Sequence, residues 1–201
     1  YGAVASSFFE PTQLVGVVGG DFPEEHRQLF SRKGIDIEGL EVADGNTFRW
    51  SGEYEANMNN RQTLSVELNV FEHFQPKLPA AWKQTDYVML GNIAPGLQSD
   101  VLTQLDSPKF VVADTMDLWI NMARQDLEKL LTGIDMLILN DSEAYLLTEE
   151  NNLIKAGRAI LAKGPRYVAI KKGEHGCMLL GKEGEYFTTG AYPLDNVNDP
   201  T

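Results

Sequence analysis

The stretch IDMLILNDSEAYLL, residues 134–147, decides the fold. Its largely apolar first part, 134–139, is typical of a strand inside a sheet. The polar run Asn140-Asp141-Ser142-Glu143 follows directly and opens a helix over 142–148. A strand that passes at once into a helix is the basic unit of an α/β protein.

The same alternation of strand and helix patterns extends along the chain in both directions. It predicts further strands at 86–91, 109–114 and 166–171, and further helices near 96–105, 124–132 and 151–163. Two more strands, 176–181 and 184–188, follow the last of these. Short apolar strands that alternate with helices indicate an α/β fold, with a mainly parallel sheet that helices cover on both faces.

Before this region, residues 2–9 predict a helix of small residues and 13–18 a strand, and a second helix begins near Pro23 and ends near Gly34. Residues 47–54 and 63–71 then alternate Thr, Val and aromatic residues with period two, so we expect an inserted β-hairpin lid at about 47–71. Phe48, Trp50 and Tyr54 share one face of its first strand. They form either the core of the hairpin or a surface that closes over a flat ligand.

Polar and glycine residues stand at the predicted carboxyl end of each strand. They are Gly19-Gly20-Asp21, Gly91-Asn92, Asp114-Thr115, the run 140–143 and Lys172-Gly173. Ligands of parallel sheets bind beyond the carboxyl ends of the strands. These residues therefore predict a ligand site at one edge of the sheet.

Several of these features also have a purely structural explanation. Asn140 and Glu143 fit a helix capping box, or a magnesium site in which few protein ligands hold metal-bound water. The segment 171–176 fits an ordinary hairpin turn, or a glycine turn that admits a ligand to the backbone. Gly19 and Asp21 form either a strand exit or one wall of a pocket.

Composition narrows the class of protein. Lys and Arg number 17 against 29 Asp and Glu, which gives a formal net charge of −12 and disfavours a nucleic-acid partner. The single cysteine, Cys177, excludes a disulfide framework within one chain. This fits a cytoplasmic location, and a secreted bacterial protein without disulfides is the alternative. No apolar run reaches the roughly 20 residues of a membrane span. The three histidines have no metal-ligand spacing.

Taken in order, the motifs resemble those of the ribokinase-like (PfkB) family of carbohydrate kinases. They are Gly16-x-Val18-Gly19-x-Asp21, the hairpin, Asp114, Asn140-x-x-Glu143, Lys171-x-Gly173-x-x-Gly176, and Asp199-Pro200-Thr201. In that family the last motif continues into Gly-Ala-Gly-Asp. The resemblance therefore implies an incomplete ribokinase-like domain over 1–201, without its first strand or strands and without its C-terminal catalytic part.

The resemblance implies an ATP- and Mg²⁺-dependent transfer of a phosphoryl group to a hydroxyl, with a monovalent cation such as K⁺ in some relatives. No catalytic residue is expected within the chain, because the base would follow Thr201. The ATP and phosphate site would be formed by Asn140, Glu143, Lys171, Gly173, Gly176, Asp199 and Thr201, with Glu143 holding the metal through water. The acceptor site would be formed by Tyr1, Gly19, Asp21, Phe48, Trp50, Asn92 and Asp114.

The expected function is therefore a kinase of a sugar or sugar derivative. A nucleoside kinase of the same fold is the first alternative, and a catalytically silent binding protein is the second. The family also implies a possible homodimer formed through the β lid. Thr-Met-Asp-Leu after Asp114 departs from the Asn and Arg found there in fructokinase and ketodeoxygluconate kinase relatives, which disfavours those two branches.

Overall fold

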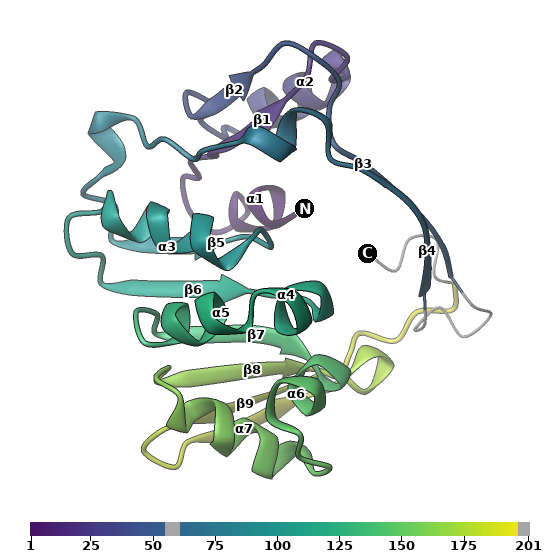
Figure 1. The fold of residues 1–201 in the computed structure, drawn as a ribbon, viewed down its shortest axis with the longest axis vertical. Coiled ribbons are helices and arrows are strands. Elements are labelled where there is room, and N and C mark those ends of the chain that lie inside the picture. Colours follow the sequence, from purple (N-terminus) through teal and green to yellow (C-terminus); the bar gives the residue numbers. More distant parts are fainter. Residues whose placement is uncertain (55–60, 197–201) are drawn as a thin grey trace. The chain divides into compact units, whose positions relative to one another are not determined.

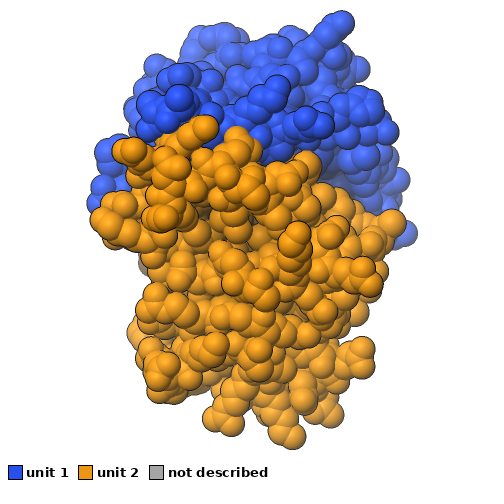
Figure 2. All heavy atoms as spheres, turned by 60° about the vertical axis from the view of Figure 1, so that its left-hand side comes forward, with its two compact units in different colours: residues 1–81, 197–201 blue, residues 82–196 orange. Residues whose placement is uncertain are grey.

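The computed structural model describes residues 1–54 and 61–196. The chain divides into two compact units, which are coloured separately in Figure 2. Unit 1 contains Tyr1–Ala81, and unit 2 is Trp82–Asn196. The predicted residues Asp199 and Thr201 lie outside the described part of the chain.

Unit 2 is built on a six-stranded sheet with the order β10-β9-β8-β7-β6-β5 (Figure 1). Its strands are β5 (Tyr87–Leu90), β6 (Phe110–Asp114), β7 (Met136–Asn140), β8 (Tyr167–Lys171), β9 (Cys177–Gly181) and β10 (Tyr186–Thr189). Strands β5 to β8 are parallel, and β9 and β10 join antiparallel at one edge. The predicted mainly parallel sheet is confirmed, with each strand end within two residues of its predicted place.

Five helices of unit 2 cover one face of this sheet (Figure 1). They are α3 (Pro95–Thr103), α4 (Asp117–Met122), α5 (Arg124–Leu131), α6 (Asp141–Thr148) and α7 (Leu153–Ala162). Alternate strand residues, such as Leu137 and Leu139 of β7, are 0 % exposed and pack against these helices in one continuous core. The predicted helices are confirmed, and α4 was not predicted.

The opposite face of the sheet carries no helix among the described residues of unit 2, although the sequence predicted helices on both faces. Ile138 and Val112 on that face are partly exposed, and Met89 at the edge is 53 % exposed. The prediction arose because β6 and β7 are apolar on both faces, which is the pattern of a doubly covered strand.

Unit 1 contains a short parallel pair and a separate hairpin. Its elements are α1 (Gly2–Ser6), β1 (Gly16–Val18), α2 (Glu24–Arg32), β2 (Leu40–Val42), β3 (Arg49–Tyr54), β4 (Arg61–Glu67) and the 3₁₀ helix η1 (Asn69–His73), and η2 (Ala80–Trp82) crosses into unit 2. Strand β1 pairs with β2 in parallel, and β3 pairs with β4 in antiparallel. The predicted hairpin is therefore present, but its second strand ends at Glu67 because Asn69, at φ 50°, turns the chain into η1.

The described helices are short, and the longest, α7, has 10 residues. Across residues 1–54 and 61–196, no helix combines the length and apolar character that a membrane span needs.

Helix α6 offers a matched test of the core. Leu147 is 0 % exposed and belongs to the helix–sheet core, whereas its neighbour Leu146 is 39 % exposed. We expect Leu147→Ala to lower the free energy of unfolding by about 3 kcal/mol, because it leaves a cavity, and Leu146→Ala to lower it by less than about 1 kcal/mol. Urea denaturation of both variants measures the difference. Equal losses of unfolding free energy in the two variants would show that α6 does not bury the side that carries Leu147.

Candidate functional site

The predicted site residues of unit 2 gather at the carboxyl edge of its parallel strands. Asp114 ends β6, Asn140 ends β7 and Lys171 ends β8, while Asn92 follows β5. Asn140 pairs with Lys171, and Asp114 pairs with Ile138, two residues before Asn140. Side chains two residues apart on a strand point to the same side, so Asp114, Asn140 and Lys171 share one face of the sheet.

Asp114 and Lys171 form an ion pair across this edge. The Nζ of Lys171 lies 3.9 Å from Oδ1 of Asp114, which is buried and has no hydrogen-bond partner among the described residues. Burial raises the pKa of Asp114, because it disfavours the charged form, and the Lys171 charge and the Thr115 N–H offset this in part. The carboxylate therefore lacks full compensation and can accept a further donor or cation.

Asn140 and Glu143 form the capping box at the start of α6. Glu143 N donates to Asn140 Oδ1 at 2.8 Å, and Asn140 N donates to Glu143 Oε2 at 2.7 Å. Glu143 is only 7 % exposed, and burial raises its pKa, with the Asn140 N–H and Lys171 lowering it and the charges of Asp114 and Asp117 adding to the rise. The structural explanation is thus confirmed, and it leaves a second buried carboxylate in the electrostatic field of Asp114 and Lys171.

Gln98 of α3 ties the ends of β5 and β6 together. It is 1 % exposed, and its Nε2 lies within hydrogen-bond distance of the carbonyl oxygens of Leu90, Gly91 and Asp114, at 3.3, 2.9 and 3.0 Å. Gln98 was not among the residues predicted from the sequence. Gln98 lies three residues after Pro95 on the buried side of α3, and a polar residue at that helical spacing is the signal that could have revealed it.

A second unpredicted contact orients Asn92. The indole Nε1 of Trp119, on α4, donates to Asn92 Oδ1 at 2.9 Å. This bond fixes the carboxamide with its oxygen toward Trp119, so its N–H₂ group is turned away from the indole. Trp119 was missed because α4 itself was not predicted.

The segment after β8 forms a tight turn built on its glycines. Gly173–His175 is a 3₁₀ turn, η3, and Gly173 and Gly176 have φ values of 54° and 84°. A Cβ on Gly176 would lie 1.9 Å from the carbonyl oxygen of Thr189, so no larger residue fits there. The hairpin-turn explanation is confirmed for this connection between β8 and β9.

The predicted aromatic residues of unit 1 lie on the hairpin. The Phe48 ring packs on Phe71 at 5.5 Å between centroids, and Trp50 Nε1 donates to Thr63 Oγ1 at 3.2 Å. Phe48 and Trp50 remain 39 % and 37 % exposed. Both earlier explanations therefore apply in part, since these side chains hold the hairpin and still present apolar surface. Tyr1, 83 % exposed, precedes α1.

Gly19 and Asp21 contact the root of the hairpin. Gly19 N donates to Thr47 Oγ1, while Asp21 accepts from Thr47 at Oδ1 and from Arg49 at Oδ2. Neither Thr47 nor Arg49 was identified from the sequence. The predicted contact of Asp21 with the phosphoryl-acceptor substrate would therefore compete with the bonds that Asp21 forms with Thr47 and Arg49.

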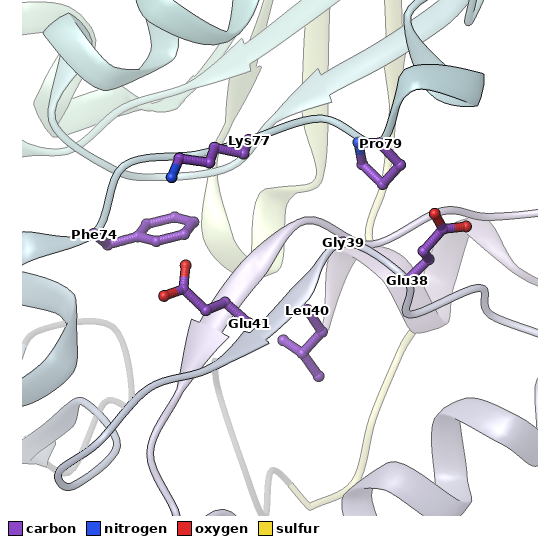
Figure 3. A pocket seen from close by; sticks show the side chains of 7 residues that line it. All are labelled: Glu38, Gly39, Leu40, Glu41, Phe74, Lys77 and Pro79. Carbon is purple, nitrogen blue, oxygen red and sulfur yellow. The ribbon is translucent and has the colours of Figure 1, made fainter.

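A surface cavity of about 190 Å³ lies elsewhere in unit 1 (Figure 3). Residues 38–41, around β2, line one side of it, and Phe74, Lys77 and Pro79 line the other. None of the predicted site residues reaches this cavity.

The chain is similar in sequence to a curated protein, the cytidine kinase of Thermococcus kodakarensis. The two are 25 % identical over 194 residues, which is 94 % of this chain and 68 % of the relative. The chain therefore spans about two thirds of the length of this relative.

The fold is similar to solved kinases. A putative ribokinase II from E. coli, in complex with ATP and Mg²⁺, matches with a TM-score of 0.75 at 17 % identity, over 97 % of this chain and 67 % of that one. The nucleoside kinase of Burkholderia thailandensis, in complex with inosine, matches with a TM-score of 0.80 at 15 % identity, over 100 % of this chain and 65 % of that one. These likenesses confirm the ribokinase-like α/β fold. The family description "pfkB family carbohydrate kinase" matches residues 3–201, nearly the whole chain, and the protein therefore belongs to the PfkB family of carbohydrate kinases.

Proposed function

We propose that the full-length protein transfers the γ-phosphoryl group of ATP to a hydroxyl of a nucleoside. The observation that carries the kinase chemistry is the cluster of Asp114, Glu143 and Lys171 at the carboxyl edge of the sheet, where parallel-sheet proteins bind their ligands. Membership of the PfkB family supports the same chemistry. The similarity to a cytidine kinase supports the nucleoside as acceptor.

A free sugar or sugar derivative is the second candidate acceptor. It is supported by the family as a whole and by the likeness of the fold to a putative ribokinase II. The exposed aromatic side chains Phe48 and Trp50 favour the nucleoside, because a flat base stacks on such rings and a small sugar does not need them.

In this proposal the residues of the strand ends bind and orient the phosphates. The Lys171 ammonium is 53 % exposed and offers its free N–H groups to a phosphate oxygen. Gln98 holds the end of β6 at Asp114, and Trp119 holds the Asn92 side chain, so both polar residues are in place before a ligand arrives.

Asp114 and Glu143 fit a magnesium ion that keeps most of its water. Among the described residues, no group of three His, Cys, Asp or Glu side chains could hold a metal directly. Mg²⁺ is commonly bound through one or two carboxylates and substrate phosphates, with waters completing its shell. The raised pKa values of both carboxyls indicate uncompensated negative charge, which a nearby cation would stabilise. When bound, the metal would neutralise charge on the transferred phosphoryl group.

The proposal also gives a role to the hairpin and a location to the protein. We assign Phe48 and Trp50 to acceptor binding.

A homodimer through the hairpin is supported by the apolar surface of β4, where Leu64 and Val66 are 63 % and 50 % exposed. Val66 pairs with Trp50, so such a dimer would adjoin the acceptor surface. A cytoplasmic location is supported by the free thiol of Cys177.

The first test is an acceptor panel with the full-length protein. We expect ATP to phosphorylate cytidine or another nucleoside with a kcat/KM at least tenfold above that for ribose or fructose. Product formation can be followed by chromatography of the phosphorylated acceptor, with ATP alone as the blank. Phosphorylation of free sugars only would contradict the nucleoside assignment, and no phosphorylation of either class would contradict the kinase assignment.

The second test concerns Glu143. Glu143→Gln keeps an oxygen that can accept from Asn140 N but removes the buried charge, so we expect the cap to be preserved and the melting temperature to be no lower than that of wild type. Turnover should fall by about 100-fold, and more Mg²⁺ should be needed for half-maximal rate. Glu149→Gln, at the exposed end of the same helix, is the matched control and should behave like wild type. Normal turnover with a lower melting temperature would mean that Glu143 acts only as a cap.

A further inference from the structure

The carboxylate of Asp21 joins the turn after β1 to the first strand of the hairpin. Its Oδ1 accepts from Thr47 N at 2.6 Å and from Thr47 Oγ1 at 2.7 Å, and its Oδ2 accepts from Arg49 at 2.8 Å. Two charge-assisted bonds to one residue and an ion pair to another engage both oxygens of this group. These contacts make Asp21 a part of the protein's own framework.

The same turn is bonded to the segment that leads into β3, and Thr47 of that segment is bonded in turn to the returning leg. Gly19 N donates to Thr47 Oγ1 at 2.9 Å, and Gly20 N donates to Gly45 O at 3.0 Å. On the returning leg, Asn69 Nδ2 donates to Thr47 O at 2.9 Å. A Cβ on Gly19 would lie 2.3 Å from Gly45 O, so the close approach requires glycine. We call the set Gly19, Asp21, Thr47, Arg49 and Asn69 the hairpin anchor.

The anchor remains charged over the whole physiological range. Hydrogen bonds from the backbone and side chain of Thr47, and then Arg49, lower the pKa of Asp21 to about 2. The ion pair with Arg49 is largely exposed and contributes little by itself. The anchor therefore depends more on the hydrogen bonds of Thr47 than on the ion pair, because Thr47 is bonded to Asp21, Gly19 and Asn69.

Strand alternation connects this anchor to the aromatic surface. Arg49 and Trp50 are neighbours in β3, so Trp50 points to the side opposite to that on which Arg49 contacts Asp21. Phe48 directly precedes β3, next to the bonded Thr47, and its ring packs on Phe71. The backbone is held at Thr47, whose N–H and C=O groups are both bonded, and from Arg49 onward by the pairing of β3 with β4. The bonds of Thr47 and the pairing of β3 thus fix the backbone from which Phe48 and Trp50 project.

We propose that Asp21 is a positioning residue, which holds the hairpin root so that Phe48 and Trp50 present a preformed surface to the acceptor. This inference rests on the proposed function, and it replaces the direct acceptor contact that the sequence suggested for Asp21. A preformed surface raises affinity because less freedom is lost on binding.

The test uses pairs of variants in the full-length protein. Thr47→Val removes the shared hydroxyl, whereas Thr47→Ser keeps it. Asp21→Asn puts an amide group opposite Arg49, and Asp44→Asn makes the same charge change at an exposed carboxyl that forms none of the described side-chain bonds. We measure KM for the nucleoside and for ATP, the melting temperature, and hydrogen exchange of the amides of residues 19–20 and 45–49.

We expect Thr47→Val and Asp21→Asn to raise the nucleoside KM at least tenfold, with the KM for ATP within twofold of wild type. Exchange at Thr47 N and Gly19 N should be at least tenfold faster, while the β3–β4 ladder keeps its protection. Thr47→Ser and Asp44→Asn should match wild type.

Unchanged exchange in Thr47→Val would overturn the anchor itself. Faster exchange with both KM values unchanged, or with both raised equally, would overturn the positioning role. If wild type phosphorylated no acceptor, the proposed function and the acceptor part of this inference would fail together. The exchange comparison would still decide whether the anchor holds the hairpin.

Discussion

Parallel strands bring all their carboxyl ends to one edge of a sheet, and the candidate site depends on that constraint. It places Asp114 and Lys171 within 3.9 Å of each other, although they are far apart in the sequence. The chain continues into α6 at the same edge, which adds Glu143 to the cluster. Burial raises the pKa of both carboxyls, so the fold holds negative charge where it is poorly solvated. Groups kept in such an environment are common where a protein binds cations or phosphates.

The two units use different physical means to hold their functional residues. In unit 2 the polar edge is supported by an apolar helix–sheet core, and the buried amide of Gln98 ties two strand ends together. In unit 1 few residues are fully buried, and hydrogen bonds carry more of the organisation. The Asp21 carboxylate and the Thr47 hydroxyl hold the root of the hairpin by hydrogen bonds. Substitutions of these residues in unit 1 should therefore change the orientation of the hairpin more than the stability of the whole protein.

The periodic part of the fold was predictable, and the contacts between separate segments were not. Strand and helix ends in unit 2 follow from the alternation of apolar runs with polar caps, and Asn140 and Glu143 were recognisable from spacing alone. Helix α4 and its Trp119 were missed because six residues are too few for a periodic signal. The partners of Asp21 lie 26 and 28 residues away, a distance over which sequence gives no local signal. Helices on both faces of the sheet were predicted because its strands are apolar on both faces. Among the described residues of unit 2, helices cover only one of these faces.

The central claim is that the buried carboxylates are kept for chemistry at a cost in stability. Asp114 tests it, because its pKa lies above the usual 3.8 and the folded state therefore binds this proton more tightly than the unfolded state. Its stabilising effect is present at low pH and is lost as the pH rises through the folded pKa. Thermal unfolding of the ligand-free, full-length Asp114→Asn protein from pH 3 to pH 8 is the most direct measurement. The account predicts a variant that melts higher than wild type at pH 8, by a margin that shrinks toward pH 3, and that has lost most kinase turnover. A variant that melts lower at pH 8 and keeps its turnover would contradict it.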